Sequence, residues 1–323
     1  MLKPTARAAD RQEPPPTGSA LEQLRGWVTD PAEAIRLACV WEATAPKLGN
    51  VHPTAAFADC GFDDFCAAAA RIAPHLASPT PHLAPPAPSQ PDAHPSPAAA
   101  HPEAPSLGTR VLAAIQATGE VTSANVNLGI VLLIAPLALA HDRADVAGVL
   151  AGLSEHDGAK VFQAIRLAAP GGMQGGEQGA VPSRWDVTAA GPVEGIDLIA
   201  AMRSAQGRDR IARQYAGDFV DFFENVVPVV EAELAGGPDI GEGIVRAQLR
   251  LLAAEPDSLI QRKCGPEVAE EVRRRAAACF TPQGQVDPGQ RAVLDHWLRQ
   301  DGNRRNPGTT ADLIAAAIYW LIR

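Results

Sequence analysis

The chain has 323 residues, of which 46% are hydrophobic, so it is long enough to bury a sizeable core as one large domain or two. Only 5% of the residues are aromatic, and alternation of Val, Ile and Thr is scarce, which favours helices over strands and predicts an all-α protein. The net charge of -9 at pH 7 argues against a nucleic-acid-binding protein, because such proteins use a basic surface to replace counterions.

Cysteine usage and hydropathy predict a cytoplasmic protein without a membrane segment. The five cysteines are odd in number and no pair has Cys-x-x-Cys spacing, so we expect reduced thiols. The first residues lack the apolar core of a signal peptide. The most apolar run, Leu128 to Ala140, covers 13 residues, which is too short to span a bilayer, and we interpret it as a buried core helix.

The N-terminal part of the chain predicts a tail followed by two helices. Residues 1–17 are rich in charge and proline and should form a mobile tail. The first helix is expected near Ser19. The second should begin where Asp30 caps and Pro31 takes the first helical position, with Glu33 completing a capping box.

A polar loop follows the second helix. It begins with Lys47-Leu48-Gly49-Asn50-Val51-His52-Pro53 and continues to Asp59, Asp63 and Asp64, so a cation, hydrogen-bonding groups and carboxylates lie close together. This composition suits a phosphate and metal site, and a polar turn between helices is the alternative interpretation. Apolar residues at helical spacing then lead through Ile72 to Leu76.

The composition changes abruptly at residues 79–105, which hold ten prolines. Proline lacks the amide donor and clashes with the preceding helical turn, so we expect an extended, solvated insertion in a helical domain that covers 18–323. His82, His94 and His101 are irregularly spaced within it, and we interpret them as solvent-exposed rather than metal-binding.

Helical patterns then alternate with short polar breaks. A helix is expected from Ser106, and an apolar helix reaching Leu139 opens at Asn125-Val126-Asn127-Leu128-Gly129. The two Asn side chains are either helix caps or ligand contacts. Further helices are expected over Asp145–Leu153 and from Ser154 to Leu167.

A glycine-rich stretch and a cluster of charges follow. Residues 172–191 should form an irregular loop, which lacks the strand-turn-helix context and the Lys-Ser/Thr ending of a P-loop. The helical pattern resumes from Glu194. Arg208 and Arg213 could bind an anion, or Asp209 could pair with Arg213 on a helix surface.

The next helices are predicted over Glu242–Ala254, over Pro266–Phe280 and from Asp287 onward. The connection from Asp257 to Lys263 ends in cations. These cations either contact phosphate or favour a helix C-terminus.

The end of the chain combines polar residues with an apolar helix. The segment Asn303 to Asp312 precedes a final helix expected over Leu313–Ile322. Free amides at its start would attract phosphate, whereas Thr309 with Asp312 also fits an ordinary cap.

Read jointly, these stretches resemble the triphosphoribosyl-dephospho-coenzyme A synthase family, the ATP:dephospho-coenzyme A transferases found with citrate lyase and malonate decarboxylase. The ordered matches extend over nearly the whole chain apart from the tail and the proline-rich insertion. The chain departs from the family pattern at Leu48, where proline is usual, and at Gln174, after which Asp186 would preserve the family's acidic residue. The matching runs are Trp41 to His52, Asn127 to Leu133, Ala164 to Ala168 with Pro170 to Met173, Arg208-Asp209 with Ile211 to Tyr215, and Asn306 to Leu313.

The resemblance implies a bundle of helices with a central active-site cavity and a Mg2+-dependent reaction in which ATP loses adenine. In that reaction the 2′-hydroxyl of the dephospho-coenzyme A ribose attacks C1′ of the ATP ribose. This is a glycosyl transfer, so positive charge develops on the ribose ring. A carboxylate should activate the hydroxyl or stabilise the ring cation, and cations should hold the triphosphate. The substrates would be ATP and a dephospho-coenzyme A-like molecule, and the family pattern also allows a homodimer.

The resemblance places candidate residues in shared motifs, and their individual roles are inferred from their chemistry. The carboxylates are expected to bind metal or to act as a general base, and the sequence does not show which of them has which role. His52 is a further catalytic candidate. The catalytic candidates are Asp59, Asp63, Asp64 and His52, the metal candidates are Asp63, Asp64 and Asp312, and the substrate or phosphate candidates are Lys47, Asn50, Asn125, Asn127, Arg208, Arg213, Lys263, Asn306, Thr309 and Thr310.

Two alternatives differ in chemistry. The Asn-Val-His and Asn-Leu-Gly versions of the motifs resemble a divergent branch associated with one-carbon metabolism, which would act on a precursor of a methanopterin- or methylofuran-type cofactor. A non-catalytic helical binding protein that kept the family core is the other alternative. This second alternative predicts that the acidic residues do not lie together in the folded protein.

Overall fold

The computed structural model describes residues 18–77, 104–168 and 194–323. Within these ranges the chain forms helices and no strand, with isolated bridges at His52–Ala55 and Phe280–Val286, so the predicted all-α class is confirmed. In chain order the helices are α1 (Ala20–Trp27), α2 (Pro31–Thr44), α3 (Phe62–Leu76), α4 (Leu107–Gly119), α5 (Leu128–Leu139), α6 (Asp145–Ala151), α7 (Glu155–Ala168), α8 (Leu198–Ala205), α9 (Arg210–Ala216), the π-helix η2 (Phe222–Val226), α10 (Val227–Ala235), α11 (Ile240–Ala254), α12 (Ser258–Cys264), α13 (Pro266–Ala278), α14 (Pro288–Arg299) and α15 (Gly308–Ile322).

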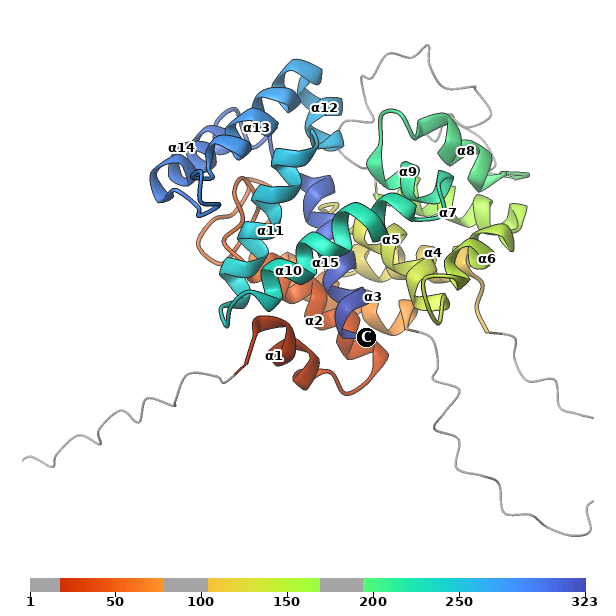
Figure 1. Ribbon diagram of the computed structural model, residues 1–323. Helices are drawn as coiled ribbons and strands as arrows, with labels where there is room; N and C mark the ends of the chain where they lie inside the picture. Colours follow the sequence, from red (N-terminus) through yellow and green to blue (C-terminus); the bar gives the residue numbers. More distant parts are fainter. Residues whose placement is uncertain (1–17, 78–103, 169–193) are drawn as a thin grey trace, which may run out of the picture.

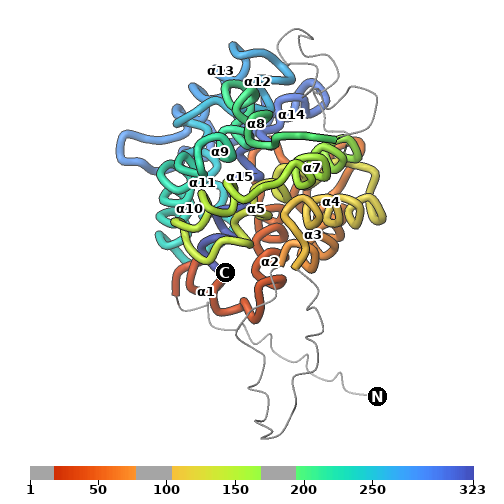
Figure 2. Tube along the Cα trace, turned by 90° about the vertical axis from the view of Figure 1, so that its right-hand side faces the viewer, coloured from red at the N-terminus to blue at the C-terminus, as the bar shows by residue number. Residues whose placement is uncertain are grey.

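The last helix, α15, lies at the centre of the fold (Figures 1 and 2). Its residues Leu313 to Ile318 are completely buried, and α2, α5, α10 and α11 pack around it. A helix that is apolar on all sides is stable only inside a protein, so its sequence requires this central position. The run predicted as a core helix forms α5 and packs directly against α15.

A second, smaller hydrophobic cluster lies where α11, α12, α13 and α14 pack together (Figure 1). Helix α11 serves both clusters, because Ile244 belongs to the main core and Val245 to the second. Ala45 and Leu48, which follow α2, are likewise divided between the two clusters. The polar loop after α2 therefore lies at the boundary between the two cores.

Buried hydrogen bonds from α11 and α14 hold this loop in place. The side chain of Gln248, which is completely buried, accepts from the Leu48 N–H at 2.8 Å and donates to the Leu48 carbonyl at 3.0 Å and to Asn50 Oδ1 at 2.8 Å. Gly49 has a φ of 70°, in the left-handed region that favours glycine, and its N–H donates to Asp295 Oδ1 at 2.8 Å. The loop is thus fixed in one conformation.

Side-chain caps begin the first two helices, and the start predicted near Ser19 and the cap predicted at Asp30 are confirmed. Ser19 caps α1 in a complete capping box, and Asp30 caps α2 with Pro31 at its first position. The capping box expected at α2 forms only in part. The side chain of Glu33 pairs instead with Arg36, one turn further along the helix.

Some boundaries differ from the prediction because distant residues decide them. The final helix begins at Gly308, five residues before the predicted start, and the expected cap between Thr309 and Asp312 does not form, since Asp257 binds Thr310 instead. The connection after Asp257 is itself a helix, α12. Helix α8 begins at Leu198 rather than at Glu194, capped by Asp197.

Three predicted segments lie outside the described residues: the tail 1–17, all but the end of the 79–105 insertion, and the glycine-rich stretch 172–191.

Within the described ranges, no helix combines the length and the apolar character needed to span a bilayer.

We predict that Gln248→Ala destabilises the protein by about 2–4 kcal/mol, because the polar groups of Leu48 and Asn50 would stay buried without their partner. Urea denaturation followed by circular dichroism measures the change. Gln290→Ala, at an exposed position of α14, is the control and should change the free energy of unfolding by less than about 0.5 kcal/mol. Equal stability of the two variants would contradict the proposed role of Gln248.

Candidate active site

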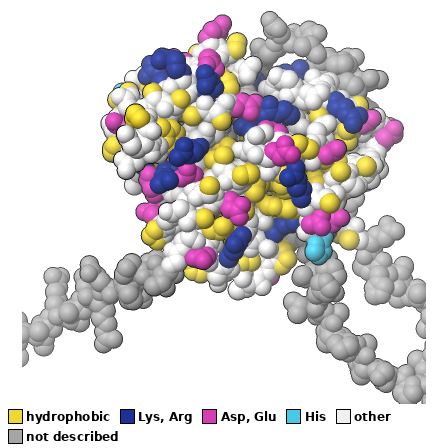
Figure 3. Space-filling view, viewed as in Figure 1, with side chains coloured by type: hydrophobic (Ala, Val, Ile, Leu, Met, Phe, Trp, Pro, Cys, Tyr) yellow, Lys and Arg dark blue, Asp and Glu magenta, His cyan; other side chains and the backbone are white. Residues whose placement is uncertain are grey.

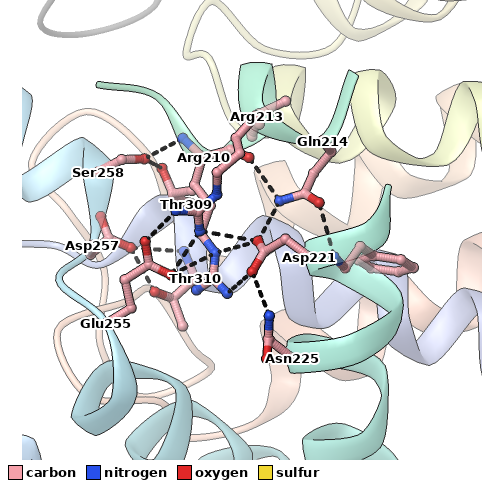
Figure 4. Close-up of polar contacts among 12 residues, drawn as sticks. Arg210, Arg213, Gln214, Asp221, Asn225, Glu255, Asp257, Ser258, Thr309 and Thr310 are labelled. Atoms are coloured by element: carbon pink, nitrogen blue, oxygen red, sulfur yellow. Dashed lines mark hydrogen bonds and ion pairs between the residues drawn. The ribbon is translucent and has the colours of Figure 1, made fainter. Parts of the chain in front are cut away.

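The N-termini of α5, α9, α12 and α15 meet at one place in the fold. The backbone N–H of Arg210, the first residue of α9, donates to the hydroxyl of Ser258, the first residue of α12, at 3.1 Å. Ser258 Oγ donates to Thr309 Oγ1 of α15 at 3.1 Å (Figure 4). Gly129, the second residue of α5, lies against Asp312 of α15. Backbone amides and the positive ends of several helix dipoles are thereby gathered together.

Asp257 joins two of these helix ends (Figure 4). Its Oδ1 accepts from the N–H groups of Leu259 at 2.9 Å and Ile260 at 3.1 Å and so caps α12. Its Oδ2 accepts from the N–H of Thr310 at 2.8 Å and from the Thr310 hydroxyl at 2.7 Å. Burial raises the pKa of the Asp257 carboxyl above its usual value, although these hydrogen bonds act in the opposite direction.

Of the carboxylates predicted from the sequence, Asp312 lies at this meeting point. A Cβ atom on Gly129 would come within 2.0 Å of Asp312 Oδ2, so the carboxylate can lie against α5 only because residue 129 is glycine. Asp312 remains partly accessible to solvent, and no other described residue donates a hydrogen bond to its carboxylate. Its oxygens are therefore available to a proton or a ligand.

The surroundings of Asp312 oppose its negative charge. Burial raises the pKa of its carboxyl well above the usual value, and the negative charges of Glu42, Asp257 and Asp209 raise it further, while Arg262 acts in the opposite direction. A carboxyl with a raised pKa is a stronger base once ionised than an ordinary carboxylate. Such a group in an accessible position is typical of a catalytic site.

Glu42 and Lys47 form a buried ion pair near Asp312. Lys47 Nζ lies 2.8 Å from Glu42 Oε1 and also donates to the Glu42 carbonyl, and both side chains are almost completely buried. Breaking such a pair would leave one charge buried and uncompensated. Because Glu42 engages the ammonium group, a phosphate contact by Lys47 stays a prediction.

Asn50 and His52 lie further along the same loop. The Asn50 side chain is held by Gln248, and its carbonyl accepts from Arg299 Nη2 at 2.9 Å. Burial lowers the pKa of His52, and the charge of nearby Arg299 lowers it further, which favours the neutral imidazole at physiological pH. A neutral imidazole can accept a proton or a hydrogen bond from a substrate.

Lys263, in the last turn of α12, lies beside the helix termini. Its Nζ is 3.2 Å from Asn306 Oδ1. Burial lowers the pKa of the amine, Arg262 lowers it further, and the carboxylates of Asp257 and Asp59 act in the opposite direction. The structure therefore brings together a subset of the predicted residues, namely Lys263, Asn306, Thr309, Thr310 and Asp312.

Of the acids predicted after the loop, Asp59 lies close enough to Lys263 to favour a higher pKa of its amine, whereas Asp63 and Asp64 show no such contact with the described residues of the site. Asp64 Oδ2 accepts from the Gly61 N–H at 2.8 Å at the start of α3, and the Asp63 side chain is exposed. Within residues 18–77, 104–168 and 194–323, no cluster of three or more His, Cys, Asp or Glu side chains is arranged to hold a metal. The expectation that Asp63, Asp64 and Asp312 together bind Mg2+ therefore has no support from the geometry and stays a prediction.

The two Asn side chains before α5 both have partners inside the protein. Asn125 Oδ1 accepts from the Leu128 N–H at 3.2 Å, which is the capping role weighed for it. Asn127 is buried, and its amide lies within hydrogen-bond distance of the Thr118 hydroxyl. Neither contact shows a ligand role.

The predicted arginines lie close to the start of α9, but Arg213 contacts carboxylates. Arg208 is exposed, and Arg213 is engaged by Glu255 at 2.6 and 2.7 Å and by Asp221 at 3.1 Å (Figure 4). The surface pair weighed for Asp209 and Arg213 does not form, because Asp209 caps α9 with one carboxylate oxygen and pairs with α12 through the other.

Sequence reasoning missed Glu42, Asp257 and Ser258 as members of this site. For Asp257 and Ser258 a local signal exists, because an Asp directly before a helical run is a typical N-cap. No local signal marks Glu42, whose position near Asp312 depends on the packing of α2 against α15.

A shallow hollow of about 400 Å³ lies elsewhere, along α7, and is lined by Glu155, His156, Lys160 and Glu194 among others. Acids and bases alternate in this lining, and none of the predicted site residues belongs to it. The chemistry of the predicted site therefore points to the helix termini rather than to this hollow.

We predict that Asp312→Asn stabilises the folded protein at neutral pH. Because the folded state raises the pKa of Asp312, it keeps a proton that the unfolded chain releases, so stability falls as pH rises from the unfolded pKa through the folded pKa. An amide does not ionise, so the advantage of the variant should be small at about pH 4 and larger at about pH 8. Denaturant titrations at both pH values measure it, with the exposed Asp63→Asn as control. An advantage that does not grow with pH would contradict the raised pKa.

Comparison with known proteins identifies the family. Residues 28–322 match the family model for ATP:dephospho-CoA triphosphoribosyl transferase. The curated proteins contain no match to the chain. A crystal structure of an Archaeoglobus fulgidus protein assigned as a triphosphoribosyl-dephospho-coA synthase aligns over 66% of this chain and 88% of its own, with 24% sequence identity and a TM-score of 0.50, which supports the helical fold. Because the family match extends over most of its length, the chain belongs to the ATP:dephospho-CoA triphosphoribosyl transferase family of enzymes.

Proposed function

We propose that the protein transfers the triphosphoribosyl group of ATP to the ribose 2′-hydroxyl of 3′-dephospho-coenzyme A and releases adenine. The observation that carries this proposal is the position of Asp312, whose carboxylate lies where the N-termini of α5 and α15 meet and accepts no hydrogen bond from another described residue. The reaction needs a base and an anion site close together. This arrangement offers both.

The triphosphate would bind at the helix termini. Backbone amides at a helix N-terminus and the helix dipole attract phosphate, and the two long helices α5 and α15 both begin here. The N–H groups of Leu128 and Thr310 are already bound by Asn125 and Asp257, so phosphate would use the other amides of these first turns. Lys263 and the Thr309 hydroxyl add a cation and a hydrogen-bonding group. On the face shown in Figure 3, basic and acidic side chains are interspersed. Because the charges are mixed in this way, a local cation such as Lys263 can bind phosphate even though the net charge of the chain is -9.

Asp312 would act as the general base. Its carboxylate takes the proton of the acceptor 2′-hydroxyl while the hydroxyl oxygen forms a bond to C1′ of the ATP ribose. The bond from C1′ to N9 of adenine breaks, and adenine leaves with the electron pair and gains a proton. Positive charge on the ribose ring is stabilised by the carboxylates around Asp312.

Mg2+ would reach the site with ATP, because Mg2+ in nucleotide sites is held by substrate phosphates and one or two carboxylates. When bound, it would neutralise part of the triphosphate charge.

A cytoplasmic location and a homodimer stay predictions.

The proposed activity predicts that free adenine appears when the protein, ATP, Mg2+ and dephospho-coenzyme A are incubated together. Asp312→Asn should reduce the rate at least about a hundredfold, which is the lower end of the contribution of a general base. Liquid chromatography of adenine measures both rates, and Glu231→Gln, at an exposed position of α10, serves as a control for loss of a carboxylate charge. Full activity of Asp312→Asn would exclude Asp312 as the base.

The acceptor is tested in the same assay. Adenine release that needs dephospho-coenzyme A supports the proposal. If adenine appears only with a precursor of a methanopterin- or methylofuran-type cofactor, the chain has the family chemistry with a different acceptor.

We further predict that Lys263→Met raises the KM for ATP by about tenfold, because one charge-assisted contact to the triphosphate would be lost. The KM for the acceptor should stay unchanged. Steady-state kinetics with each substrate varied in turn separates the two effects. Lys160→Met, in the hollow along α7, is the control, and an unchanged KM for ATP in Lys263→Met would remove Lys263 from the site.

A further inference from the structure

An unusual stretch of backbone follows α9. Asp218 and Phe219 have φ angles of 51° and 60°, in the left-handed region that residues other than glycine rarely adopt. Directly after them comes the π-helix η2, and Phe219 is completely buried. Strained residues and π-helices persist where the surrounding structure enforces them, and they are frequent next to functional sites.

The side chain held by this stretch is Asp221, at the start of η2. Its Oδ2 accepts from Arg210 Nε at 3.0 Å, from Arg213 Nη2 at 3.1 Å and from Gln214 Nε2 at 2.7 Å. Its Oδ1 accepts from Arg210 Nη2 at 3.2 Å and from Asn225 at 3.0 Å (Figure 4). Although burial opposes its charge, the hydrogen bonds and charges of Arg210 and Arg213 hold the pKa of Asp221 well below its usual value. The carboxylate is a fixed anchor.

The anchor is connected to the helix termini through Arg210. The guanidinium group of Arg210 is bound by Asp221, and its Nε also lies 3.3 Å from Glu255 Oε2. The backbone N–H of the same residue donates to Ser258, and Ser258 donates to Thr309 in α15. Fixing the guanidinium group therefore also fixes the position of the first turn of α9 against α12 and α15.

We propose that Asp221 is a positioning residue for the triphosphate site, which it sets through Arg210, Ser258 and Thr309 without touching the substrate. This inference rests on the proposed binding of triphosphate at the helix termini. Neither the sequence pattern nor the family resemblance singled out Asp221. Its role follows from the hydrogen bonds that connect it to the ends of three helices.

Inorganic tripolyphosphate tests this role without the acceptor or the chemical step. Asp221→Asn keeps the shape of the side chain but removes its charge, and it should weaken binding of tripolyphosphate with Mg2+ by about tenfold to a hundredfold, the range expected when a supporting contact is lost. Isothermal titration calorimetry measures the dissociation constant, and circular dichroism checks the fold. Unchanged binding by folded Asp221→Asn would overturn the inference and leave the triphosphate site intact.

Glu233→Gln is a matched control. Glu233 is a buried carboxylate that also binds two arginines, Arg246 and Arg250, but it lies between α10 and α11, away from the helix termini. Its loss should lower the thermal stability as well, while tripolyphosphate binds as in the wild type. Equal weakening in both variants would show a general loss of stability and would overturn the positioning role.

Two further outcomes have to be interpreted: an Asp221→Asn variant that does not fold, and a wild-type protein that does not bind tripolyphosphate. If Asp221→Asn does not fold, the double variant with Arg210→Met removes both charges of the pair, which buried pairs often tolerate. The folded double variant should show the same weaker binding, and wild-type affinity would overturn the inference. A wild-type protein that does not bind tripolyphosphate would contradict the triphosphate site itself, and the positioning role with it.

Discussion

The arrangement of the site depends on the carboxylate of Asp257. One of its oxygens binds the first amides of α12, and the other binds the amide and hydroxyl of Thr310 in α15. These two helices are separated in sequence by α13 and α14, and loop closure alone would leave their relative position undetermined. This buried side chain therefore joins the start of the central helix to α12, together with the hydrogen bond from Ser258 to Thr309.

The same region contains interactions that a protein selected for stability alone would avoid. Asp312 is held among other carboxylates, and Asp218 and Phe219 adopt left-handed backbone conformations. Each feature reduces stability, and each lies next to the helix termini or is connected to them. The buried middle of α15, Leu313 to Ile318, and the surrounding core supply the stability that allows these features to persist.

Much of the fold could be predicted from the sequence because its signals are local. The helix start near Ser19, the Asp30 cap and the apolar run of α5 depend on neighbouring residues, and they were placed correctly. The start of α15 was placed wrongly because its cap, Asp257, lies about fifty residues earlier in the chain. Lys263, Asn306 and Asp312 were predicted from their segments and lie in one region of the structure, and their roles stay predictions. The hydrogen bonds of Asp221 depend on how the chain turns back onto α9 after Gly217, so no pattern in the sequence revealed them.

The central claim is that the triphosphate lies where the helix termini meet, with the ribose facing Asp312. The most direct test is a crystal structure with Mg2+ and the triphosphate of 9-deazaadenosine, in which a carbon–carbon bond replaces the bond to N9 and cannot be cleaved in the same way. The account predicts phosphate oxygens within hydrogen-bond distance of Thr309 or the first amides of α5 and α15, and C1′ next to the Asp312 carboxylate. A nucleotide bound in the hollow along α7, or beside Asp63 and far from Asp312, would contradict it.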